Sequence, residues 1–319
     1  MGAAQEVGCD LKRAFFTALL LTAAAGLSHA ETFYVTVAGL GGEQEYEQRF
    51  TGWAKEIEQV LKNEPNAKIE TLMGAQATRA NIQARLADIA KQAKADDNVI
   101  LFMIGHGSFD EGGYKFNIPG PDVTGNDLGA WLDKIPAHIA VINMTSASGG
   151  IISAAQKPRR VVITATKSGT EKNATVFARY FIEALRDPAA DADKNEIITA
   201  LEAFRYAEAK TAKFYEENKR IATEHPLIED TGKGDGVKAP AVENGQGLVA
   251  GRFALLHTGS AAAVAKDPEK QKLLKEKEDV EAKIDDLKYR KAAMSIQEYR
   301  QELQKLLVEL AKTQEALDK

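Results

Sequence analysis

Short apolar runs alternate with amphipathic segments along most of the chain. Between the runs, apolar residues recur at three- and four-residue steps, which is the spacing of a helix with one buried face. Strands and helices that alternate in units of about 30 residues are typical of a mainly parallel sheet covered by helices on both faces. We therefore predict an α/β fold, a three-layer αβα sandwich, with strands at Thr32–Ala38, Lys68–Met73, Val99–Ile104, Ile139–Met144 and Arg160–Thr166.

The segments around these strands supply the other predicted elements. Thr78 is the expected N-cap of a helix, because its hydroxyl can accept a backbone N–H. Residues 222–247 are polar and contain glycine and proline, so we expect them to cross the surface before an apolar return at Leu248–Leu256. The pattern also predicts a hairpin at Gly112–Pro121 and helices at Tyr46–Leu61, Leu128–Leu132, Thr175–Leu185 and Ile197–Arg220.

Two of the strands end in residues that are suited to chemistry. The continuous apolar run Val99–Ile104 opens into Gly-His-Gly, with His106 between the glycines. The run Ile139–Met144 opens into Thr-Ser-Ala-Ser-Gly-Gly, which contains Ser146. In parallel sheets, ligands bind beyond the carboxyl ends of the strands. We therefore expect His106 and Ser146 to lie at the same edge of the sheet.

These strand ends resemble those of the caspase and legumain (hemoglobinase) superfamily of cysteine peptidases, and in particular its exported legumain-like members in bacteria. The resemblance rests on H-G-S at residues 106–108 and S-A-S-G at residues 146–149, where the family has a catalytic His and a nucleophilic Cys in a C-x-S-G pattern. It implies a caspase-like fold, with His106 as a catalytic residue and Ser146 at the nucleophile position. It also implies that the backbone N–H groups of Gly107 and Ser146 form an oxyanion hole.

The family's cysteine is absent from this site. A thiol is acidic enough to be partly ionised near neutral pH, whereas a serine hydroxyl needs a closely bonded, oriented base. No carboxylate that would orient His106 is recognisable in the sequence. Two hypotheses follow: a peptide-binding pseudo-peptidase without activity, or an active peptidase that uses Ser146 with His106. A third interpretation takes His106 as no more than a polar strand end.

Composition and charge restrict the partners. The chain has 319 residues and a formal net charge of −5, which argues against nucleic acid and anionic membrane surfaces as partners. We expect a peptide or protein ligand, as the resemblance implies. The single cysteine, Cys9, lies near the N-terminus, so the mature chain would have no thiol for a disulfide, a metal site or a nucleophile.

Residues 1–30 have the layout of a secretory signal peptide. A basic pair precedes the apolar run Ala14–Leu27, and a small-x-small cleavage sequence, Ser-His-Ala, ends at Ala30. We expect cleavage there, export to the periplasm or the extracellular space, and no membrane span in the mature protein. The alternative is an N-terminal anchor helix, for which the apolar run is short.

The segment Asp191–Glu202 matches a calcium-loop pattern. Such loops place oxygen ligands at positions 1, 3, 5 and 12 and a backbone carbonyl at position 7. Position 6, where the motif has glycine, is Glu196. The alternative is an acidic turn that caps the following helix. The calcium hypothesis assigns the ion to the side chains of Asp191, Asp193, Asn195 and Glu202 and to the carbonyl of Ile197.

From Pro268 onward, the composition changes to Lys, Glu, Gln and Leu. Apolar residues then follow a seam of three- and four-residue steps, and Ser295-x-x-Glu298 is a capping box that starts a second helix. We predict an antiparallel helical hairpin over residues 266–319, after a caspase-like domain over residues 31–258. The hairpin is either a docking or self-association module or a solvated appendage.

Overall fold

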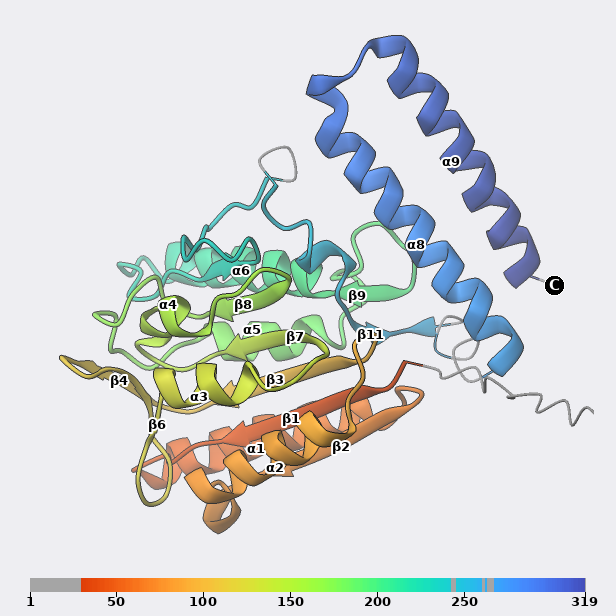
Figure 1. Cartoon of the computed structure of the whole chain (residues 1–319). Helices are drawn as coiled ribbons and strands as arrows, with labels where there is room; N and C mark the ends of the chain where they lie inside the picture. Colours follow the sequence, from red (N-terminus) through yellow and green to blue (C-terminus); the bar gives the residue numbers. More distant parts are fainter. Residues whose placement is uncertain (1–29, 242–244, 260–261, 263–266, 319) are drawn as a thin grey trace, which may run out of the picture.

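The protein is built around a six-stranded, mainly parallel sheet (Figure 1). The structure, a computed structural model, describes residues 30–241, 245–259, 262 and 267–318. The strand order is β10-β8-β7-β3-β1-β2. The five predicted strands are confirmed, with ends shifted by two residues at most, as β1 (Thr32–Ala38), β2 (Ala67–Leu72), β3 (Asn98–Ile104), β7 (His138–Asn143) and β8 (Arg160–Thr164).

The remaining strand of this sheet, β10 (Leu227–Glu229), pairs antiparallel with β8 and has no counterpart in the prediction. It lies within the polar segment 222–247 that we expected to cross the surface. Three residues are too few to show an alternating pattern. Ile228 is buried because β8 offers a free edge to this segment, which is a property of the assembled sheet.

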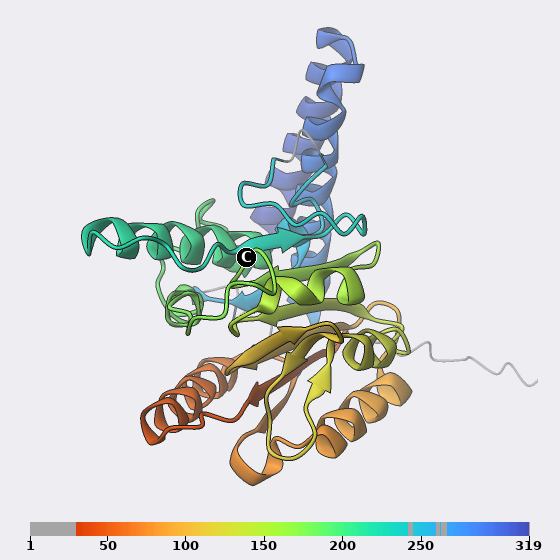
Figure 2. The same ribbon diagram turned by 90° about the vertical axis from the view of Figure 1, so that its left-hand side faces the viewer.

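Helices cover both faces of the sheet, which confirms the three-layer sandwich (Figure 2). Successive side chains of β3 pack alternately against the two helical layers. Ile100 and Phe102 belong to the core on one side of the sheet, and Val99 and Leu101 belong to the core on the other. The first layer holds α1 (Gln44–Leu61), α5 (Phe177–Ala184) and α6 (Ala200–Glu217), and the second holds α2 (Arg79–Gln92), α3 (Gly125–Leu132) and α4 (Ile152–Ala155).

The predicted helix Ile197–Arg220 is wrong at its start. Its first three residues form a strand, β9 (Ile197–Thr199), and the helix begins only at Ala200. Thr199 is the N-cap, and its side chain forms a capping box with Glu202. The β-branched residues before the cap pair with β11 (Ala254–His257), which lies at the end of the expected apolar return.

The predicted hairpin at Gly112–Pro121 is also wrong in extent. The chain turns earlier and forms a three-stranded meander directly after His106. Its strands are β4 (Gly107–Asp110), β5 (Gly113–Phe116) and β6 (Val123–Thr124). Short 3-10 helices lie at Gly74–Gln76, Ser148–Ile151, Ala250–Arg252 and Lys291–Ala293.

Helices α8 (Pro268–Arg290) and α9 (Ile296–Leu317) form the predicted C-terminal pair and stand beside the sandwich (Figure 1). Ser295 caps α9 with the predicted capping box. Within the described part of the chain, no helix combines the length and apolar character needed to cross a bilayer. The predicted signal peptide, residues 1–30, lies outside the described residues except for Ala30.

His257 connects the sandwich to α8. Its Nδ1 lies 2.5 Å from Oε1 of Glu64, in the turn after α1, and its Nε2 lies 3.5 Å from Oε1 of Glu278 in α8. Burial lowers the pKa of His257, but hydrogen bonds and charges from the two carboxylates outweigh this effect and raise the pKa to about 10. The imidazolium is therefore charged at neutral pH and holds α8 against the sandwich.

Candidate functional site

The two strand ends that resemble the peptidase family meet at one edge of the sheet. Strands β3 and β7 are parallel neighbours, with Met103 opposite Asn143, so their carboxyl ends lie side by side. The chain after β3 carries His106 and Gly107, and the chain after β7 carries Ser146. The two tips are in direct contact, because Gly107 N lies 3.1 Å from Ser146 Oγ.

Ser146 uses its hydroxyl to join the tips. Its Oγ accepts the N–H of Gly107 and donates to the carbonyl of Gly107, each at 3.1 Å. The side chain is buried, since Ser146 is only 2% exposed. The hydroxyl proton is thus directed at a carbonyl. The Gly107 N–H, which the resemblance places in an oxyanion hole, already has Ser146 Oγ as its acceptor.

Gly107 is suited to this contact by its place in the meander. His106 accepts a hydrogen bond from Asn117 N–H, so the next pair along the ladder, Gly107 with Phe116, is not hydrogen-bonded across it. The polar groups of Gly107 therefore point away from β5 and toward Ser146. A Cβ atom at position 107 would lie 2.4 Å from the Ser146 carbonyl oxygen, so only glycine fits.

His106 lies in an aromatic pocket of α1. Its ring packs edge-on against Tyr46 and Phe50, with ring centroids 4.7 and 5.1 Å away. Burial lowers the pKa of His106, and a hydrogen bond with the Gly41 carbonyl and the charge of Glu43 oppose this effect only in part. The imidazole is therefore neutral near pH 7. Within the described residues, its ring forms no hydrogen bond with Ser146 or with a carboxylate.

A buried polar network, which no pattern in the sequence predicts, supports the Ser146 tip. Tyr114 OH lies 2.7 Å from Thr145 Oγ1, which donates to Asn143 Oδ1 at 2.8 Å. Burial raises the pKa of Tyr114, so its hydroxyl stays protonated. Ser148 Oγ accepts the N–H groups of Ala165 and Thr166 at the end of β8. Ser148 is therefore a structural residue of the tip.

A carboxylate–histidine pair next to the Ser146 tip was also missed. Ala147, whose φ of 55° is left-handed, donates its N–H to the Glu171 carbonyl at 2.7 Å. The Glu171 side chain holds His225 Nδ1 at 2.5 Å and accepts His225 N–H at 3.1 Å. The two residues are 54 positions apart, so no local pattern links them.

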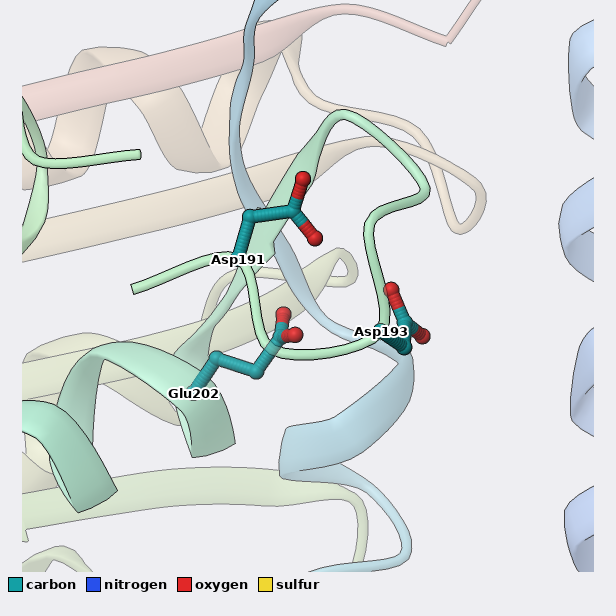
Figure 3. Close-up of side chains that lie close together, drawn as sticks. All are labelled: Asp191, Asp193 and Glu202. Carbon is teal, nitrogen blue, oxygen red and sulfur yellow. The ribbon is translucent and has the colours of Figure 1, made fainter. Parts of the chain in front are cut away.

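The residues of the predicted calcium loop come together in part. Carboxylate oxygens of Asp191, Asp193 and Glu202 lie within 4.8 Å of one another, and Figure 3 shows Asp191 and Glu202 pointing into the space that the loop encloses. Asn195 is adjacent, because its Nδ2 donates to Asp193 Oδ2 at 3.2 Å. Ile197, whose carbonyl completes the predicted ligand set, belongs to strand β9.

These carboxylates also have partners of their own. Asp191 accepts the N–H groups of Asn195 and Glu196, and Glu202 accepts those of Ala192 and Thr199. Such bonds are what an acidic capping turn provides. Burial, followed by the charges of Glu202 and Asp191, raises the pKa of Asp193. A cation would relieve this repulsion, so both interpretations of the loop retain a physical basis.

Comparison with known proteins gives similarities in overall structure. The sequence matches no protein-family model and no curated protein. Protein GSU0716 of Geobacter sulfurreducens has a TM-score of 0.42 at 11% identity, over 63% of this chain and 93% of its own. The Drosophila initiator caspase Dronc has a TM-score of 0.40 at 14% identity, over 74% of this chain and 94% of its own. Caspase-1 of Spodoptera frugiperda has a TM-score of 0.41 at 14% identity, over 63% and 87%.

The architecture agrees with the one that the sequence predicted from its hydrophobic pattern and from the two motifs. A mixed α/β fold, a mainly parallel sheet and a C-terminal helical pair are all present. This arrangement is consistent with a caspase-like fold.

Proposed function

We propose that this protein is a caspase-like pseudo-peptidase, which binds a peptide at the sheet edge formed by His106 and Ser146 but does not cleave it. The observation that carries the proposal is the position of Ser146 Oγ, which is bonded to both backbone groups of Gly107. An active serine nucleophile has its proton held by a base. A carbonyl oxygen is no base at neutral pH, so the hydroxyl of Ser146 is not activated.

Attack on a peptide bond would need two changes at this site. Ser146 Oγ would have to leave Gly107, and its proton would have to reach His106, which packs against aromatic rings of α1. The lowered pKa of His106 keeps the ring neutral but also makes it a weaker base. In addition, no carboxylate among the described residues bonds to the imidazole, whereas a carboxylate orients the base in serine hydrolases. We infer that the wild-type protein has no peptidase turnover.

Three considerations support a peptide as the ligand. The family resemblance implies one, and the carboxyl edge of a parallel sheet is where such folds bind ligands. The negative net charge of the chain disfavours nucleic acid. The backbone N–H of Ser146 is the remaining donor of the implied oxyanion pair, and it would bind a peptide carbonyl without cleaving it.

Activity and binding can be measured on the same variants. We expect no labelling of the wild type by a fluorophosphonate probe and no cleavage of a mixed pool of fluorescent peptides. Fluorescence polarisation should detect peptide binding that His106→Ala weakens. Gln304→Ala is the control, because Gln304 is exposed on α9 and belongs neither to this edge nor to another proposed site. Ser146→Cys should gain labelling by a thiol-directed peptide probe, since the mature chain has no other thiol.

Two results would overturn the proposal. Wild-type turnover that is lost in both Ser146→Ala and His106→Ala would establish a serine peptidase instead. A Ser146→Cys variant that stays inert, together with no peptide binding by the wild type, would mean that this edge holds no peptide. The function would then reside elsewhere, for example on the α8–α9 hairpin.

We also propose that the protein is exported and begins at Glu31 in its mature form. The proposal rests on the apolar run and the small-x-small sequence before that residue. Expression in a bacterium, followed by fractionation and mass determination, should find the shorter chain outside the cytoplasm. Recovery of only the full-length chain inside the cell would contradict it.

A further inference from the structure

A cavity lies at the sheet edge opposite to His106 and Ser146, where β7 and β8 begin. Its volume is about 350 Å³. Apolar side chains, among them Ile135, Pro136 and Pro158, form part of the wall. The cations Lys157, Arg159 and Arg160 and the imidazole of His138 form another part. The cavity is therefore amphipathic, and its positive charge lies at the start of β8.

The cations of the cavity are only partly neutralised. Asp133 pairs with Lys157 at 3.2 Å and with Arg160 at 2.8 Å. Within the described residues, Arg159 has no hydrogen bond or ion pair. Asp96 is the sole carboxylate among the described residues that line the cavity. The wall therefore carries an excess of positive charge, and Arg159 is the group available to a ligand.

Arg160 adds a largely buried positive charge at the same place. Its side chain is 5% exposed, and its two terminal nitrogens are bonded to Ala155 and Asp133. Its Nε–H is buried and has no partner among the described residues. Because Nε is not accessible from the cavity, Arg160 acts on a bound anion through its charge, which the shared Asp133 neutralises only in part.

Arg159 itself is held in a strained backbone conformation. Its φ is 67°, in the left-handed region that favours glycine. A large side chain at such a position costs stability, and strain of this kind is often found at binding sites. Replacement of Arg159 by glycine should therefore stabilise the fold. A loss of ligand binding in the same variant could then not be attributed to a loss of stability.

We propose that this cavity binds a small organic molecule through an oxyanion group, a phosphate or a carboxylate. The group accepts hydrogen bonds from the guanidinium of Arg159, since guanidinium groups favour planar oxyanions, and it is attracted by the positive charge of Arg160. The carbon skeleton of the ligand contacts Ile135, Pro136 and Pro158. This site is independent of the peptide edge proposed above.

Titration calorimetry on the full chain tests the site with two probes, pyrophosphate for a phosphate ligand and citrate for a carboxylate ligand. We expect saturable binding of at least one probe, and the stronger one identifies the chemical class. Arg159→Gly should weaken that binding at least tenfold and raise the melting temperature, because it removes both the guanidinium and the strain. A lower affinity for the probe together with a higher melting temperature is expected only if Arg159 binds the ligand.

Lys219→Gly is the matched control. Lys219 is an exposed cation with a left-handed φ of 51° at the end of α6, away from the lining of the cavity. The substitution should also raise the melting temperature and leave probe binding within twofold of the wild type. Absence of saturable binding of either probe to the wild type would overturn the proposal. So would equal binding by the wild type and by Arg159→Gly.

Discussion

Replacement of Ser146 by alanine distinguishes a structural hydroxyl from a poised nucleophile. The substitution removes one oxygen atom, which is bonded to both the N–H and the carbonyl of Gly107. Because the Gly107–Phe116 pair is not hydrogen-bonded across the meander, neither group has β5 as a substitute partner. Ser146→Ala therefore leaves a donor and an acceptor unpaired at a buried contact.

The size of the effect follows from the number of bonds. A typical hydrogen bond contributes about 1 kcal/mol net, and a buried group left unpaired costs about 1–3 kcal/mol. Ser146 is 2% exposed, so water cannot readily replace the two lost hydrogen bonds. We therefore expect Ser146→Ala to lower the free energy of unfolding by about 2 kcal/mol. An active nucleophile behaves differently, because residues held for catalysis are commonly neutral or destabilising for the fold.

Urea denaturation monitored by tryptophan fluorescence measures this difference. Ser146→Ala should lower the midpoint without a change in the slope of the transition. Ser153→Ala is the control, since Ser153 is exposed on α4 and its hydroxyl has no described partner. A Ser146→Ala variant as stable as the wild type, or more stable, would refute the structural role and revive the peptidase hypothesis.

Three further predictions follow from the structure. Gly107→Ala should destabilise the protein by about 2 kcal/mol or more in the same assay, because its Cβ would meet the Ser146 carbonyl oxygen at 2.4 Å. The folded-state pKa of His257, about 10, is above its ordinary value of 6.5, so its contribution to stability is complete below pH 6.5 and lost toward pH 10. His257→Gln should therefore cost about 3 kcal/mol at pH 6 and progressively less toward pH 10, in denaturation curves measured across that range. The calcium hypothesis requires that millimolar Ca²⁺ raise the melting temperature of the wild type but not of Asp193→Asn, and an unchanged wild-type curve would leave the acidic turn.

Much of the fold was predictable because its signals are local. A continuous apolar run such as Val99–Ile104 predicts a buried strand without reference to the rest of the chain. Apolar residues at steps of three to four likewise predict the buried face of a helix. Caps are local as well, and Thr78 and Ser295 cap α2 and α9 as predicted. The meeting of the His106 and Ser146 tips follows from the parallel order of β3 and β7, which the alternation of elements implies.

The tertiary structure decided what the Ser146 hydroxyl does. The same short sequence is compatible with a nucleophile and with a structural contact, because the partner of the hydroxyl lies 39 residues away. Strand β10, the Glu171–His225 pair and the cavity beside Arg159 have the same origin. Each depends on which distant groups the packed sheet brings within reach. Tertiary packing determines hydrogen-bond partners and cavities, whereas hydrophobic periodicity is a local property of the sequence.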